Sequence, residues 1–67
     1  MPGCSTVEQL ALEQALRALP PEQREVVHLH VYEGMTFQEV ANATAESINT
    51  VSARYRYALD KMRKMLQ

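Results

Sequence analysis

The chain has 67 residues, 46% of them hydrophobic, and a formal net charge of −1, which limits it to one small domain with a modest core. Its single cysteine, Cys4, excludes an internal disulfide. No apolar run approaches the roughly 20 residues that span a bilayer, and the N-terminus does not have the pattern of a signal peptide. We therefore expect a cytoplasmic protein that makes no membrane contact.

Charge is distributed unevenly along the chain. The first 46 residues contain two basic and seven acidic side chains, a net charge of −5, whereas the remainder contains five basic and one acidic, a net charge of +4. This asymmetry indicates an anionic partner for the second part only. The alternative is a final helix whose cations complement its own dipole. That alternative accounts for Arg63 and Lys64 but not for Arg54 and Arg56, which come earlier.

The expected fold is all-α: a small four-helix domain that contains a helix-turn-helix with a long C-terminal recognition helix. Residues 1–4 have no apolar partner and are expected to be disordered, which leaves residues 5–67 as the domain. Apolar residues at helical spacing predict a first helix to about Ala18. Ser5 and Glu8 fit the capping box at its start.

A second helix is predicted from Pro21 to Glu33. Proline is favourable at the first helical position, where its missing N–H is no loss, and Gly34 is a natural residue just beyond the end. The apolar side chains of this helix cover nearly its whole circumference: Val26, Val27, Leu29, Val31 and Tyr32. Such a helix is covered on more than one side, or it offers one side to a partner.

The helix-turn-helix follows. Thr36 and Glu39 form a second capping box, which predicts a short third helix over about residues 37–43. A turn then leads to Ser47, the expected N-cap of a fourth helix over residues 48–66. At 1.5 Å per residue, that helix is roughly 28 Å long.

A helical wheel divides the fourth helix into two faces. The apolar face holds Ile48, Val51, Tyr55, Ala58, Leu59, Met62, Met65 and Leu66. The polar face holds Asn49, Ser52, Ala53, Arg56, Tyr57, Asp60, Arg63 and Lys64. Arg54 falls at the edge of the apolar face, and we expect its guanidinium to pair with Glu39 of the third helix.

A helix-turn-helix places the N-terminal part of its second helix in the major groove of DNA. There Arg56 could pair with a guanine edge and Asn49 with an adenine, while Ala53 could touch a thymine methyl group. The candidate DNA-binding residues are Gln38, Asn49, Thr50, Ser52, Ala53, Arg56 and Tyr57. The remaining basic residues, Lys61, Arg63 and Lys64, lie too far along to read bases. A plain four-helix bundle with a solvated polar face fits the pattern equally well.

Several segments together resemble region 4 of bacterial sigma-70-family factors, particularly the small extracytoplasmic-function group. The matching segments, in order, are Leu19-Pro20, Gln23-Arg24-Glu25-Val26, Glu33-Gly34-Met35-Thr36, Glu39-Val40-Ala41, Thr50-Val51 and Arg54 through Arg56 to Ala58. The resemblance covers nearly all of residues 10–66. No single segment is diagnostic, but their order and spacing are specific.

The resemblance implies recognition of the promoter −35 element by the fourth helix. It also implies docking of the RNA polymerase β-subunit flap on the earlier helices, to which we assign Val27, Val31 and Tyr32, and an anti-sigma factor as a further partner. The resemblance also implies departures: family members usually carry Lys or Arg where this chain has Ser52, and often Arg where it has Tyr57. The alternative is therefore a protein-interaction module that binds polymerase or an anti-sigma factor without reading DNA by itself.

Nothing in the sequence predicts an enzyme, a cofactor or a metal site. No nucleophile–base arrangement, glycine-rich phosphate loop or carboxylate pair is present. His28 and His30 are two residues apart on a helix, so they point roughly 160° away from each other and cannot share a metal. Both are interpreted as ordinary helical residues.

Overall fold

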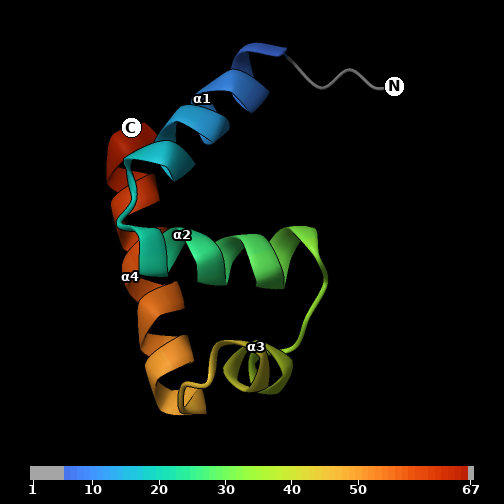
Figure 1. The fold of residues 1–67 in the computed structure, drawn as a ribbon. Coiled ribbons are helices and arrows are strands. Elements are labelled where there is room, and N and C mark those ends of the chain that lie inside the picture. The colour runs from blue at the N-terminus through green and yellow to red at the C-terminus, as the bar shows by residue number, and fades with distance from the viewer. Residues whose placement is uncertain (1–5, 67) are drawn as a thin grey trace.

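The computed structural model describes residues 6–66. Along them run α1 (Thr6–Ala18), α2 (Pro21–Val27), the π-helix η1 (His28–Tyr32), α3 (Phe37–Thr44) and α4 (Ile48–Leu66) (Figure 1). The described part contains no strand, which confirms the all-α prediction. None of its helices is long and apolar enough to cross a membrane. The predicted disorder of residues 1–4 and the cap at Ser5 lie outside the described residues.

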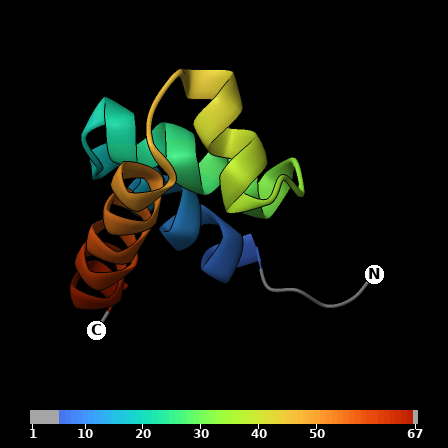
Figure 2. The ribbon, with the colours of Figure 1, turned by 90° about the horizontal axis from the view of Figure 1, so that it is seen from below.

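Helix α4 is the element against which the other helices pack. Helices α1, α2 and α3 all contact it. Figure 1 shows α3 beside its N-terminal turns, α2 crossing near its middle and α1 toward its C-terminal end, and Figure 2 shows the same arrangement from below. The bounds of α4 match the predicted 48–66, and its buried residues run from Val51 to Met62.

The core consists of two clusters, and α4 contributes to both. One cluster joins α1, α2 and the second half of α4 through Ala15, Leu19, Val27, Ala58 and Met62. The other joins α2, α3 and the first half of α4 through Val26, Val40, Ala41 and Val51. Tyr55 packs against both clusters. Because Val26 and Val27 are adjacent in α2 and enter different clusters, α2 separates the two halves of the core.

An aromatic cluster ties η1 and α3 to α4. The ring of His30 lies 4.5 Å from that of Phe37 and 4.9 Å from that of Tyr55, centroid to centroid. His30 Nδ1 is 2.7 Å from the carbonyl oxygen of Met35, so this nitrogen carries the proton and donates it. The sequence interpretation of an ordinary helical residue understated His30, because it could not place Phe37 and Tyr55 beside it.

The second helix ends near the predicted residue, but its last part is a π-helix. The backbone N–H of Glu33 donates to the carbonyl of His28, five residues back, at 3.1 Å. Gly34 follows with a φ of +72°, which is the left-handed conformation expected just past a helix end. The π-helical turn of η1 is wider than the turns of α2, so the second helix is a regular α-helix only as far as Val27.

The helix-turn-helix begins as the sequence predicts. The backbone N–H of Glu39 donates to Thr36 Oγ1 at 3.1 Å, and that of Thr36 donates to Glu39 Oε1 at 2.8 Å, which confirms the capping box. The backbone N–H of Thr50 donates to Ser47 Oγ at 3.1 Å, which confirms the cap of α4. Both helices therefore start at positions set by local hydrogen bonds.

The turn between α3 and α4 contains a left-handed alanine. Ala45 has φ 58° and ψ 38° and directly follows α3. In this conformation the Cβ approaches the following carbonyl oxygen, at a cost of roughly 1–2 kcal/mol for a residue other than glycine. The backbone N–H of Glu46 donates to Ala41 O at 3.0 Å and closes the turn. This hydrogen bond to the end of α3 keeps Ala45 in the left-handed conformation.

Replacing Ala45 with glycine should raise the stability of the domain. Glycine removes the left-handed strain but costs about 0.5–1 kcal/mol in extra unfolded-state entropy, so we expect a net gain of about 0.5–1 kcal/mol. That gain corresponds to an increase in Tm of about 2–8 °C for a domain of this size. Thermal unfolding followed by circular dichroism measures it.

The matched control is Ala43→Gly, an exposed alanine inside α3. There glycine relieves no strain and should lower stability by about 1 kcal/mol. If Ala45→Gly and Ala43→Gly lowered the stability of the domain equally, Ala45 would not be strained.

Candidate nucleic-acid interface

The first half of α4 presents its polar side chains on the side opposite the core. Val51 is wholly buried, which directs the other side of the helix outward. Asn49, Arg56 and Tyr57 are exposed to solvent, and Tyr57 is 64% exposed. Thr50, Ser52 and Ala53 are half-buried. Six of the seven predicted DNA-binding residues thus belong to one short stretch of one rigid helix.

Asn49 and Arg56 share one face of α4. They are seven residues apart, which is nearly two full helical turns and roughly 10 Å along the axis. An asparagine amide and an arginine guanidinium are the groups that pair in two-point fashion with adenine and guanine edges. The spacing allows both to reach base edges in one groove.

Gln38, the seventh predicted residue, lies on α3. Its side chain is exposed in the first turn of that helix, and Figure 1 shows α3 beside the first turns of α4. Gln38 Nε2 donates to Asn42 Oδ1 at 3.2 Å, so one of its donors is engaged within α3. Its carbonyl oxygen and second N–H have no hydrogen bond among the described residues.

The predicted pairing of Arg54 with Glu39 is wrong. Arg54 Nη1 lies 3.6 Å from Glu46 Oε2, in the turn that leads into α4. The carboxylate of Glu39 instead accepts the backbone N–H of Thr36 at the N-terminal end of α3. The sequence analysis had given the Glu39 carboxylate two roles, in the capping box and as the partner of Arg54, and the structure shows the first of them. Arg54 still ties the turn to α4, as its half-buried side chain suggests.

The apolar face of α4 extends farther than the core covers it. Ile48 at one end and Leu59, Met65 and Leu66 toward the other are between 41% and 49% exposed. The helical wheel had placed all four on the apolar face. It defines which residues share a face, but α1, α2 and α3 cover only the narrower strip of that face that holds Val51, Ala58 and Met62.

The structure divides the residues predicted to dock on a protein partner. Val27 is only 3% exposed and packs in the core with Leu19 and Ala58, so the prediction that it is a surface residue is wrong. Val31 and Tyr32, at the end of η1, are 53% and 51% exposed. The end of η1 lies away from α4, so these two residues are separate from the Asn49–Arg56 face (Figure 1).

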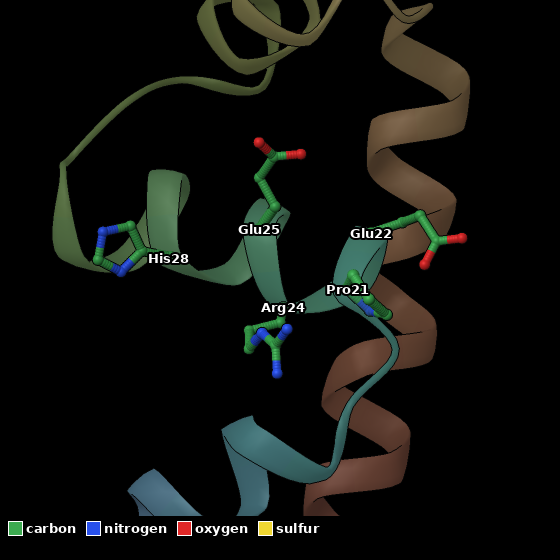
Figure 3. Close-up of a pocket in the computed structure, with 5 residues that line it drawn as sticks. All are labelled: Pro21, Glu22, Arg24, Glu25 and His28. Atoms are coloured by element: carbon green, nitrogen blue, oxygen red, sulfur yellow. The ribbon is translucent and has the colours of Figure 1, made fainter.

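A shallow hollow of about 550 Å³ runs along α2 and is lined by Pro21, Glu22, Arg24, Glu25 and His28. Arg24 and Glu25 point in opposite directions in Figure 3, and Arg24 Nη1 donates to the carbonyl of Arg17 at the end of α1, at 3.3 Å. The hollow therefore has no convergent set of polar groups, and nothing in it suggests catalysis or ligand recognition.

The two histidines are separate, as predicted. His28 is exposed, with Nε2 3.2 Å from Glu33 Oε2 and its ring 5.6 Å from that of Tyr32, whereas His30 is part of the aromatic cluster. Within residues 6–66 no group of three or more histidine, cysteine or acidic side chains could hold a metal ion.

Known proteins resemble this chain over most of its length. Residues 15–64 match the family described as "Sigma-70, region 4". The chain is 34% identical over 59 residues to the ECF RNA polymerase sigma factor SigK of Mycobacterium tuberculosis (strain H37Rv) and to that of Mycobacterium bovis (strain AF2122/97). The match covers 88% of this chain but only 32% of either relative, so the chain spans about a third of their length.

The contact between Arg54 and Glu46 should be measurable in a double-mutant cycle. With side chains 29% and 38% exposed, the pair should show a coupling energy of about 0.3–1 kcal/mol in urea unfolding of the Arg54→Gln and Glu46→Gln variants. The cycle of Arg54→Gln with Glu39→Gln should show none, although Glu39→Gln alone loses part of the capping box. Coupling to Glu39 and not to Glu46 would contradict the observed pairing.

Proposed function

Because this chain belongs to the sigma-70 family, as its region 4, we propose that α4 recognises the −35 element of a promoter during transcription initiation. Region 4 is not an enzyme: its family consists of transcription initiation factors. One observation carries the proposal. Asn49 and Arg56 project from the same exposed face of α4, whose first turn is capped by Ser47 and buttressed by α3.

The proposed contacts follow from the position of each side chain. Arg56 reads a guanine and Asn49 an adenine in the major groove. The half-buried Ser52 and Ala53 permit a close approach of the helix to the base edges, and Tyr57 adds a large amphipathic side chain beside Arg56. Thr50 and Gln38 contact the backbone or neighbouring bases. Arg54 takes no part in reading, because it is engaged with Glu46.

Arg56→Ala should weaken binding to a recognised duplex by about 5- to 150-fold, which corresponds to the loss of one two-point base contact. The duplex is selected by the chain itself from a random library and measured by fluorescence anisotropy at low salt. Arg56 is exposed, so the variant should unfold like the wild type. The control, Lys61→Ala, removes a cation from another side of α4 and should have a much smaller effect. A wild-type affinity that does not depend on Arg56 would refute the proposed reading mode.

A second candidate function is docking on the RNA polymerase β-subunit flap, or on an anti-sigma factor, without independent DNA reading. The exposed pair Val31 and Tyr32 favours it, because two adjacent apolar side chains half-exposed at the end of a helix resemble the anchors of protein interfaces. The two functions are compatible, since the docking pair and the Asn49–Arg56 face lie on different elements. A docked domain would be held close to promoter DNA, which increases its effective concentration.

The double substitution Val31→Gln with Tyr32→Ala should weaken binding to a flap fragment by at least about fivefold, as loss of an interface anchor does. Isothermal titration calorimetry measures it. Leu59→Gln, on an exposed apolar residue of α4, is the matched control and should bind like the wild type. Equal affinities for the double variant and the wild type would rule out this docking surface. Val27→Glu is unsuitable, because a buried charge in the core would unfold the domain.

A further inference from the structure

Asp60 is the one acidic residue of the chain after Glu46, and it holds the two cations that follow it on α4. Its Oδ1 lies 3.7 Å from Arg63 Nη2, and its Oδ2 lies 3.2 Å from Lys64 Nζ. One carboxylate thus engages two basic side chains, one with each oxygen.

The two cations continue the rows of side chains that begin in the proposed reading half of α4. Arg63 follows Arg56 by seven residues, and Lys64 follows Tyr57 by seven. Seven residues are almost two helical turns, so each cation faces the same side as its predecessor, roughly 10 Å farther along the axis. The major groove is about 12 Å wide, and its edges are lined with phosphates. If the first half of α4 docks in the groove as proposed, Arg63 and Lys64 would lie where the helix leaves the groove and passes a phosphate strand.

We propose that Asp60 restrains sequence-independent DNA binding by α4, because its carboxylate occupies Arg63 and Lys64 and repels the nearby phosphates. The inference rests on the proposed DNA binding and adds a limit on its strength. Phosphate contacts supply most of the affinity for any sequence, whereas base contacts supply the discrimination. Withholding two cations weakens binding to every sequence by the same factor and leaves the base contacts unchanged, so base contacts supply a larger share of the affinity that remains.

A purely structural role for Asp60 is the alternative. Pairs at three and four residues apart stabilise helices slightly, but side chains of Arg63 and Lys64 that are 70% and 74% exposed contribute little in this way. The two interpretations predict opposite changes in DNA affinity when the Asp60 carboxylate is removed. Loss of a structural pair loosens the end of α4 and leaves DNA affinity unchanged or lower, whereas loss of a restraint increases it.

The test is Asp60→Asn, which keeps the shape and a similar helix propensity. We expect binding at low salt to become about three- to tenfold tighter, on the selected duplex and on a random-sequence duplex alike, because phosphate contacts are independent of sequence. The slope of log affinity against log salt should steepen by about 0.9 for each additional phosphate that α4 neutralises. Anisotropy titrations at several salt concentrations measure both.

Two controls isolate the effect of position and of the cations. Glu33→Gln makes the same change in net charge at a carboxylate of similar exposure just after η1, 56% against 49% for Asp60, and should change affinity less than twofold. Asp60→Asn introduced into the Arg63→Gln, Lys64→Gln background should likewise change affinity less than twofold. An equal increase in that background, or an increase no larger than that of Glu33→Gln, overturns the proposal.

The experiment separates failure of this inference from failure of the proposed function. If the wild type binds duplexes in an Arg56-dependent manner and Asp60→Asn does not increase the affinity, the restraint is refuted and the reading mode stands. If neither the wild type nor Asp60→Asn binds any duplex at low salt, both are refuted. Thermal unfolding of Asp60→Asn confirms that α4 remains folded in the comparison.

Discussion

Burial of one face of α4 is the constraint on which the other helices and both proposed surfaces rely. Val51 and Ala58 are wholly buried seven residues apart, and Tyr55 between them packs against both core clusters. The helix is thereby held from both ends and cannot rotate without exposing apolar surface, at roughly 25 cal/mol for each Å². Because this face is fixed, the opposite face is fixed as well, and Arg56 and Asn49 can be presented to a partner without further ordering.

The entry into α4 is determined by short-range hydrogen bonds and one ion pair. The Ser47 cap sets the first turn, the left-handed Ala45 turns the chain, and Arg54 with Glu46 joins the turn to the helix. A partly exposed ion pair adds little net stability, so its role is one of geometry. Local strain and local capping together fix the direction in which the chain enters α4, and packing then holds the helix from Val51 to Met62.

The proposed function combines weak general attraction to DNA with docking through a separate apolar pair. The proposed reading face carries one cation, Arg56, and the carboxylate of Asp60 pairs with Arg63 and Lys64 farther along α4. A domain with few phosphate contacts binds DNA weakly and with a shallow salt dependence. Docking through Val31 and Tyr32 would compensate by increasing the local concentration of the domain near the promoter. The two proposed surfaces therefore complement each other.

Local signals in the sequence were enough to place the ends of most helices, because Pro21, Gly34, the Thr36–Glu39 box and the Ser47 cap act within one turn of the backbone. They also identified the face that carries Arg56, since helical periodicity is a local property. The packing of the helices was needed to show that Val27 is buried, that Ile48 is exposed, that Arg54 pairs with Glu46 and that His30 joins the aromatic cluster. These outcomes depend on which helix covers which part of a face, and periodicity within one helix does not contain that information.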